Sequence, residues 1–327
     1  MPEKITKKDL DILGKLEENA RIPLKAIAKA VHMSPEAVSY RISRLEKAGC
    51  IIRYHTITNY FKLGFYKYKL YMRLKAPKPA LVDEICSYFK EHKKTEWVAH
   101  TAGRWDVIAA FLIRTPVEFA DEIEKFMEKY SEVVLERAVT QTLYLAHQPR
   151  GSVVESEAKS IVYHTLTDKP RPADELDMKI LRAIANNARA PVKTIAKAIG
   201  STPRKVAYRM KQLEDDEVIL AYKAHINVRA FGRSFNKLIL YLKSMDSEKR
   251  EKFIKFCGAM PNVVWPQKVL GAWDFEIDLD AAEDASMYAA ISSIYEKFPD
   301  AILNHEHCLE VKEYKLDLFP GALPEFK

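Results

Sequence analysis

Residues 19–31 read NARIPLKAIAKAV, and residues 187–199 read NARAPVKTIAKAI. The two stretches lie 168 positions apart, and the same offset matches residues throughout the 327-residue chain. The matched pairs include Asp9/Asp177, Pro35/Pro203, Tyr40/Tyr208, Leu45/Leu213, Tyr54/Tyr222, Gly64/Gly232, Gly103/Gly271, Trp105/Trp273 and Asp106/Asp274. Because the register holds without net drift, the chain is a duplication of one module of about 140 residues.

Composition excludes several classes of protein. Hydrophobic residues make up 48% of the chain, which is typical of a folded protein rather than a disordered one. The net charge of +7 is carried by residues 1–150, while residues 151–327 are neutral overall. Four scattered cysteines do not form a disulfide framework. The start MPEKITKKDL has no apolar signal core, and no run approaches the ~18 apolar residues of a membrane helix, so we expect a cytoplasmic protein with no membrane contact.

The first part of each copy has the spacing of three short helices. Apolar residues recur at helical intervals at Leu10, Leu13, Leu16, Leu24, Ile27, Ala28, Val31, Val38, Ile42 and Leu45. The third helix is expected to begin at Ser34-Pro35, a capping side chain followed by the helical position that tolerates proline, and Thr202-Pro203 repeats this signal. The segments GCIIRYHTI (49–57) and EVILAYKAHI (217–226) then predict an extended segment or wing.

The second part of each copy has a different pattern. We expect strands over 66–75 and 235–243, helices over 79–90 and 247–257, two strands joined around GRWD and GAWD, helices over 116–129 and 281–297, and last strands over 133–145 and 302–316. This order, β-α-β-β-α-β, predicts a ferredoxin-like antiparallel sheet with helices on one face. The other face is where two modules would pack.

The predicted fold class is therefore α+β, with a helix-turn-helix (winged-helix-like) domain followed by a ferredoxin-like βαββαβ domain, each present twice. The expected divisions are a helix-turn-helix domain at 1–60, a ferredoxin-like domain at 61–148, a linker at 149–173 with a short strand over 160–166, a second helix-turn-helix domain at 174–229 and a second ferredoxin-like domain at 230–320.

The third helix of each small domain is the expected DNA-reading element, since the last helix of a helix-turn-helix lies in the major groove. At 100° per residue, Val38, Ile42 and Leu45 share the inner face. The outer face then carries Glu36, Tyr40 and Ser43 in the first copy and Arg204, Tyr208 and Lys211 in the second. Residues 7–57 and 175–225 each carry a net charge of +4, as phosphate binding requires.

The stretch 9–64, with LDIL, the NAR turn, SPEAVSYRISRLEKAGCI and a glycine after the wing, resembles the leucine-responsive regulatory protein/AsnC family of transcription regulators. The repeated GxWD resembles the effector domain of that family. The resemblance implies a helix-turn-helix that binds double-stranded DNA and a ferredoxin-like domain that dimerises through its sheet and binds an amino acid or another small effector. No cofactor is implied.

The DNA-contact prediction comprises phosphate-binding cations and the residues on or beside the outer face of each third helix. These residues are Lys25, Ser34, Glu36, Ser39, Tyr40, Arg41, Ser43, Arg44, Lys193, Thr202, Arg204, Lys205, Tyr208, Arg209, Lys211 and Gln212. Phosphate contacts are assigned to Lys25, Arg41, Arg44, Lys193, Arg209 and Lys211.

The second copy departs from the family pattern after its third helix. Gly49 is replaced by Glu217, within the acidic run Asp215-Asp216-Glu217, so three like charges are expected to oppose phosphate contact at the second wing. The effector-loop residues implied by the resemblance are Gly103, Asp106, Gly271 and Asp274. In any hairpin, such glycines permit the turn and such aspartates cap it.

A tandem copy supplies both halves of a DNA-binding unit in one chain, as an intramolecular pseudo-dimer that is also able to form a further homo-oligomer. Glu36 against Arg204 and Ser43 against Lys211 predict an asymmetric operator.

Two other functions compete with this interpretation. Siroheme decarboxylases share the two-domain plan and carry a polar stretch across the central hairpin. In this chain the equivalent stretch reads WVAHTAGRWDVIAAF in the first copy and VVWPQKVLGAWDFEI in the second. His100 is the suggestive residue, and Lys268 replaces it in the second copy. A regulator that senses a ligand without binding DNA is the other alternative. The run His305-Glu306-His307-Cys308 resembles a metal cluster, but one strand does not make a site, and no metal is predicted.

Overall fold

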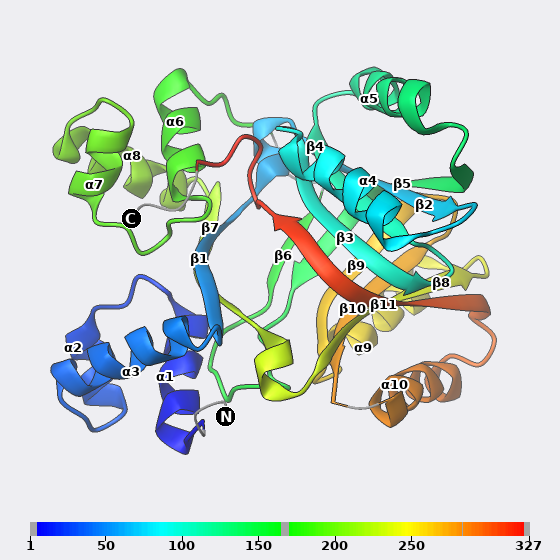
Figure 1. Cartoon of the computed structure of the whole chain (residues 1–327). Coiled ribbons are helices and arrows are strands. Elements are labelled where there is room, and N and C mark those ends of the chain that lie inside the picture. Colours follow the sequence, from blue (N-terminus) through cyan, green and yellow to red (C-terminus); the bar gives the residue numbers. More distant parts are fainter. Residues whose placement is uncertain (1–4, 165–169, 283, 324–327) are drawn as a thin grey trace.

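The computed structural model describes residues 5–164, 170–282 and 284–323. Two three-helix domains lie on one side of the molecule and a large sheet with its covering helices lies on the other (Figure 1). The small domains consist of α1 (Lys7–Glu18), α2 (Leu24–Ala30) and α3 (Pro35–Lys47) in the first half, and α6 (Glu175–Ile184), α7 (Val192–Ala198) and α8 (Pro203–Asp215) in the second. The three predicted helices of each copy are confirmed.

Capping side chains fix where the third helix of each domain begins. The Ser34 hydroxyl accepts a hydrogen bond from the Ala37 amide at 3.1 Å, and the Thr202 hydroxyl accepts one from the Lys205 amide at 3.4 Å. Proline occupies the next position in both helices. The predicted starts are therefore confirmed, since a capped amide and a proline at the first turn both stabilise a helix N-terminus.

The two wing segments pair with each other. Strand β1 (Ile51–Thr58) and strand β7 (Ile219–Ile226) form a two-stranded antiparallel ladder in which Tyr54 lies opposite Ala224 and Thr56 lies opposite Tyr222. The sequence predicted an extended segment in each copy but not its partner. Each helix-turn-helix domain is therefore joined to the other through its wing.

The NAR stretches fasten the same junction on both sides. The Arg21 guanidinium donates to the carbonyl oxygens of Ala188 (2.5 Å) and Ala190 (3.1 Å). In the reciprocal contact, Arg189 donates to the Ala20 carbonyl oxygen at 2.5 Å. Each guanidinium also lies over a tyrosine ring of the ladder, Arg21 at 5.3 Å from the Tyr222 centroid and Arg189 at 5.2 Å from the Tyr54 centroid. We call these two reciprocal contacts the arginine clasp.

The larger part of each half follows the predicted order β-α-β-β-α-β. In the first half the elements are β2 (Tyr66–Leu74), α4 (Pro79–Glu91), β3 (Thr95–Gly103), β4 (Val107–Ile113), α5 (Pro116–Tyr130) and β5 (Val134–His147). In the second half they are β8 (Ser234–Leu242), α9 (Ser247–Gly258), β9 (Val263–Gly271), β10 (Phe275–Ala281), α10 (Asp284–Lys297) and β11 (Ile302–Leu316). Short 3₁₀ helices, η1 (Tyr60–Leu63) and η2 (Val228–Phe231), lead from the wings into these strands.

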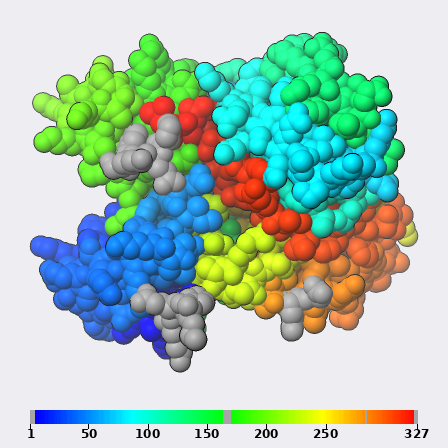
Figure 2. Space-filling view, in the orientation of Figure 1, coloured from blue at the N-terminus to red at the C-terminus, as the bar shows by residue number. Residues whose placement is uncertain are grey.

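The expectation of two separate sheets is wrong. The strands form one sheet in the order β2-β4-β3-β11-β8-β10-β9-β5, and β5 also pairs with β2, so eight strands close on themselves. The joints are β3 with β11 and β9 with β5, each of which pairs one half of the chain with the other. Closure gives hydrogen-bond partners to the edge strands that an isolated half would leave unpaired. Figure 2 shows the last strand crossing between the elements of the two halves.

The helices cover the outside of this sheet, and the inside is filled by both halves. Helices α4 and α5 pack on one arc of strands and α9 and α10 on the opposite arc (Figure 1). Inside, the Tyr71 ring lies edge-on to Trp273 with centroids 4.6 Å apart, and Trp105 lies 5.9 Å from Trp273. Both tryptophans belong to the buried core inside the sheet.

A charged network is buried beside these rings. The Lys69 ammonium contacts the Glu276 carboxylate at 2.5 Å, and the Lys237 ammonium contacts Asp278 at 2.5 Å and Glu276 at 3.3 Å. Lys69 and Lys237 are matched positions of the repeat, whereas both acids come from β10. Buried charges of opposite sign are needed here because an unpaired charge inside a sheet is strongly destabilising.

The predicted linker is partly packed into the fold. Strand β6 (Ile161–His164) pairs with β5, within the predicted strand 160–166, whose last two residues lie outside the described part. Val154 is 2% exposed and packs in the core of the first helix-turn-helix domain. A Cβ on Gly14 would lie 2.3 Å from the Glu155 carbonyl oxygen, so the segment runs directly against α1.

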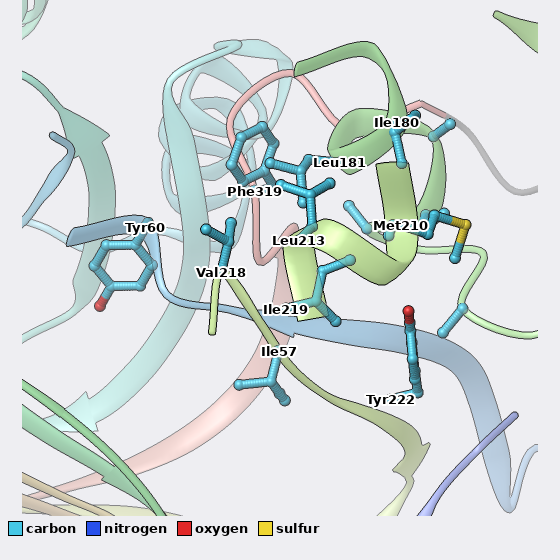
Figure 3. Packing of buried hydrophobic residues seen from close by; sticks show 14 of the residues in the cluster. Ile57, Tyr60, Ile180, Leu181, Met210, Leu213, Val218, Ile219, Tyr222 and Phe319 are labelled. Atoms are coloured by element: carbon cyan, nitrogen blue, oxygen red, sulfur yellow. The ribbon is translucent and has the colours of Figure 1, made fainter. Parts of the chain in front are cut away.

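The C-terminal segment completes the second helix-turn-helix domain. Phe319 is fully buried and packs with Leu181 and Leu213, in the same cluster as Ile57 and Tyr60 of the first half (Figure 3). The core of this domain therefore draws on three distant stretches of the chain. None of the described helices is long and apolar enough to cross a membrane.

The joints between the halves depend on glycine. Gly271 has φ +146°, and a Cβ there would lie 2.2 Å from the Val139 carbonyl oxygen on β5. We expect Gly271→Ala to lower the free energy of unfolding by roughly 1–3 kcal/mol more than Gly232→Ala, because backbone rather than a side chain must move. Gly232 is the matched control, since it has φ +70° but open space around its Cβ position. Urea denaturation measures both, and equal losses would contradict a tight joint.

Candidate nucleic-acid interface

Helices α3 and α8 bury the predicted face and expose the other. Val38, Ile42 and Leu45 are at most 6% exposed, while Tyr40 is 69% exposed. The second copy repeats this, with Tyr208 62% exposed. A large aromatic side chain left in solvent on a recognition helix is available to contact a base or phosphate.

Most of the predicted contact residues lie on the surface. The exposed ones are Lys25, Ser34, Glu36, Ser39, Tyr40, Lys193, Thr202, Arg204, Lys205, Tyr208 and Lys211. The half-buried ones are Arg41, Ser43, Arg44, Arg209 and Gln212. Each copy thus brings its set together around one third helix and the helix before it (Figure 1).

The arginines of the third helices also hold their own domains together. The Asp9 carboxylate, fully buried on α1, contacts Arg41 at 2.9 Å and Arg44 at 2.5 Å. In the second copy Arg209 contacts Asp177 at 2.9 Å and Asp174 at 2.5 Å. These ion pairs anchor the recognition helix on the first helix, a structural role that the assignment of these arginines to phosphate did not include. Phosphate contact by them stays a prediction.

The Asp9 pKa reflects the strength of this anchor. Burial opposes the charged form, but hydrogen bonds from Thr6, Arg41 and Arg44 outweigh burial and lower the pKa of the carboxyl. Thr6 and Asp9 also complete a reciprocal capping box at the start of α1. The same aspartate therefore fixes both the first helix and the orientation of the third.

Each residue of the acidic run at the C-terminal end of α8 contacts a cation. Asp215 contacts Lys211 at 2.7 Å, Asp216 contacts Arg171 at 2.6 Å, and Glu217 contacts Lys62 at 2.9 Å. Glu217 has φ +54°, the backbone conformation that Gly49 has in the first copy at +69°. The expected repulsion of phosphate by three free carboxylates is therefore weakened, although Lys211 shares its charge with Asp215.

The predicted effector residues have clear structural roles. The Asp106 carboxylate accepts from the Leu74 amide at 2.7 Å, and Asp274 accepts from the Leu242 amide at the same distance. Gly103 approaches β11 as closely as Gly271 approaches β5, with a Cβ position 2.3 Å from the His307 carbonyl oxygen. Asp274 also lines a cavity of about 370 Å³ together with Lys268. Their binding of an effector stays a prediction.

The residues of the metal-like run are engaged with other side chains. The Tyr295 hydroxyl is hydrogen-bonded to Nδ1 of His305 at 3.0 Å, and the Asn236 side-chain oxygen is hydrogen-bonded to Nε2 of His307 at 2.7 Å. The Glu306 carboxylate accepts from Trp105 and Tyr241.

Residues 5–52 match the winged helix-turn-helix DNA-binding family, and residues 174–214 match the AsnC-type helix-turn-helix domain. An uncharacterised helix-turn-helix transcriptional regulator of Pyrococcus furiosus is 30% identical over 105 residues, which cover 32% of this chain and 68% of that protein. The regulator LrpB of Bacillus subtilis is 40% identical over 57 residues, 17% of this chain and 38% of LrpB. The chain belongs to the Lrp/AsnC family.

The whole Lrp/AsnC-type chain also has the fold of a solved enzyme. The siroheme decarboxylase NirDL matches 96% of this chain and 94% of its own with a TM-score of 0.63 and 11% identity. At that identity the likeness concerns the fold alone. This match includes both halves of the chain, whereas the match to the Pyrococcus regulator covers 32% of it.

Sequence reasoning missed the residues that join the two halves of this Lrp/AsnC-family chain. Arg21 and Arg189 were taken as part of a helix-turn-helix turn, yet both reach across to the other copy. The signal was the repeat of NAR itself, together with the repeat of Tyr54 at Tyr222. Asp9 and Asp177 left a similar signal as a matched pair of acids in the first helical turn.

We expect Asp9→Asn to lower the free energy of unfolding at pH 7 by roughly 2 kcal/mol, because two arginines lose a charged partner. Since the folded pKa lies below the ordinary value of 3.8, the contribution of Asp9 is complete above the ordinary pKa and is lost as the pH falls through the folded one. The difference between variant and wild type should therefore shrink in acid. Urea denaturation across pH 3–7 measures this, with Asp11→Asn on the same helix as control. A pH-independent difference would contradict the ion-pair role.

Proposed function

We propose that this chain is a sequence-specific DNA-binding transcription regulator in which two different recognition helices, joined in one chain, read an asymmetric operator. The observation that carries the proposal is the arginine clasp on the β1–β7 ladder, which joins two helix-turn-helix domains of unlike outer faces. The helix-turn-helix matches in both halves support DNA binding by each domain.

The two outer faces differ where base contacts are expected. Glu36 in α3 corresponds to Arg204 in α8, and both side chains are exposed. Arginine favours the guanine edge in the major groove, whereas glutamate accepts from the cytosine amino group. A unit with these two faces reads two different half-sites.

The junction between the domains favours a fixed half-site spacing. The Tyr54 hydroxyl donates to Glu46 near the end of α3 at 2.6 Å, and Tyr222 donates to Glu214 of α8 at 2.6 Å. The same two rings lie under the clasp arginines. Each recognition helix is thereby tied to the other domain through one tyrosine, which supports an intramolecular pseudo-dimer with one operator geometry.

In this proposal each half of the closed sheet is a ferredoxin-like unit, and the two units take the places of the two protomers of a dimer. The strand orders β5-β2-β4-β3 in the first half and β11-β8-β10-β9 in the second support this arrangement. A small effector such as an amino acid would act at the loops of Gly103/Asp106 and Gly271/Asp274, between the strands that join the units.

Selection from a genomic DNA fragment pool at two salt concentrations tests the proposal. We expect retention of a defined asymmetric motif, with affinity falling steeply as salt rises. Enrichment of a perfect palindrome would contradict the asymmetric operator. No enrichment at low salt would remove DNA binding and favour a ligand-sensing protein.

Two classes of variant separate positioning from base recognition. Lys25→Ala and Lys193→Ala, on exposed matched positions of α2 and α7, should weaken binding to all sequences and lower the salt slope by about one. Tyr40→Ala and Arg204→Ala should change which bases are preferred in one half-site each. Identical behaviour of the two classes, measured by competition against shuffled operators, would show that the outer-face assignment is wrong.

The fold shared with NirDL favours one second candidate, a siroheme decarboxylase-like enzyme. His100 on β3 is half-buried, and Lys268 at the matched position lines a cavity. An enzyme of this kind should give a stoichiometric Soret-band shift when an iron tetrapyrrole is added, and His100→Ala should reduce it. Absence of any shift at micromolar protein would exclude this candidate without affecting the DNA experiment.

A further inference from the structure

A cavity of about 360 Å³ lies between the wing ladder and the closed sheet. One wall comes from the wings, with Arg53 of β1 and His225 of β7, which are register partners in the ladder. The opposite wall comes from β11, including Glu310 and Glu313. We call this space the wing cavity. Its volume is within the range of small-molecule sites.

Two buried polar atoms beside the wing cavity have no hydrogen-bond partner within the described part of the chain. The His225 side chain has an unpartnered Nδ1, and the Glu310 carboxyl has an unpartnered Oε2. Both residues are 7% exposed. An unsatisfied buried donor or acceptor is costly, so a ligand that bonds these atoms gains that free energy on binding.

Among the side chains that line the cavity, cations outnumber acids. Arg53, Arg150, Arg229 and Lys312 line it, against Glu310 and Glu313. Burial raises the pKa of both glutamates, with repulsion from Asp278 adding to the shift of Glu310 and repulsion from Glu310 adding to that of Glu313, and this reduces the negative charge near neutral pH.

The lowered pKa values of two neighbouring histidines agree with a positive electrostatic potential at the cavity. Burial, together with the positive charges of Arg150, Arg53 and Lys223, lowers the pKa of His55 to about 3. Burial and the same arginines also hold the pKa of His225 well below its usual value. These imidazoles are therefore neutral at pH 7, and the charge of the site comes from the arginines.

We propose that the wing cavity binds a small organic anion, through a carboxylate or phosphate held by Arg229 and Arg150, with its apolar part against Phe235 and Trp265. All four side chains line the cavity. Arg229 contacts Glu310 at 3.3 Å and Arg150 contacts Asp280 at 3.5 Å. An entering anion therefore displaces these acids from the arginines or shares the arginines with them. None of Gly103, Asp106, Gly271 and Asp274 lines this cavity, which makes it distinct from the effector loops.

The position of the cavity gives the ligand a regulatory role, and this part rests on the proposed DNA binding. The cavity that would hold the anion is lined both by residues of the two wing strands, including Arg53 and His225, and by strands of the sheet. The wings carry the clasp and the tyrosines that are tied to the recognition helices. Binding therefore changes the free energy of the domain arrangement that contacts DNA, and the affinity for operator shifts with it.

The direct test is calorimetric titration of the full chain with citrate, 2-oxoglutarate and inorganic phosphate as probes, together with tryptophan fluorescence, since Trp265 lines the cavity. We expect at least one probe to bind with a Kd of about 1 mM or lower, so that its binding saturates by about 10 mM. Arg229→Gln should weaken its binding at least about tenfold, which corresponds to about 1.4 kcal/mol. Glu310→Gln should tighten binding, because it removes the acid that competes for Arg229.

Arg104→Gln is the matched control. Arg104 is also a surface arginine paired with a glutamate, Glu136 at 2.6 Å, and its side chain is 40% exposed against 43% for Arg229. Three results would each overturn the anion site. They are equal weakening by Arg104→Gln, no saturable binding of any probe, and binding of the dication putrescine that Glu310→Gln abolishes. Thermal melting shows that each variant is folded.

The regulatory part has a separate readout. Operator affinity is measured with and without the bound probe, in wild type and in Arg229→Gln. A shift in the wild type that is lost in the variant supports regulation. An unchanged operator affinity overturns regulation while the binding site stands, and absence of any DNA binding overturns the proposed function instead.

Discussion

The antiparallel pairing of β1 with β7 is the contact on which the rest of the arrangement depends. A wing strand alone exposes unpaired amide and carbonyl groups, and here each strand supplies the partner of the other. The pairing brings Arg21 within reach of the Ala188 carbonyl and Arg189 within reach of the Ala20 carbonyl. Tyr54 then lies between a guanidinium of the other copy and Glu46 of its own helix. The two DNA-binding domains are thus held by the same few side chains that orient their recognition helices.

The sheet applies the same principle on a larger scale. Each half ends in edge strands, and the edges close on those of the other half through β3–β11 and β5–β9. Closure requires close backbone approach, which Gly103 and Gly271 allow. It also encloses Lys69 and Lys237 with the acids of β10, so the interior is charged as well as aromatic. The halves are equal in connectivity but unequal in chemistry, since the second supplies the acids.

This inequality is also found at the functional surfaces. The exposed faces of α3 and α8 differ in charge, and the cavity beneath the wings takes its acids from β11 of the second half alone. The arginines of the third helices have a structural role, because Arg41, Arg44 and Arg209 hold the helix on its domain through buried aspartates. A duplicated chain permits such divergence, since each copy is free to specialise while the other keeps the common framework.

The sequence by itself determined the repeat, the three helices of each small domain, their caps and the exposed side of each third helix. These features are local, because apolar spacing, a capping hydroxyl and proline at the first turn act within a few residues. Only the tertiary structure decided that wing pairs with wing, that the two sheets close into one, that Asp9 holds Arg41, and that Glu310 faces His225 across a cavity. Each of these contacts joins residues far apart in the chain, and an edge strand carries no local mark of the partner with which its hydrogen bonds will form.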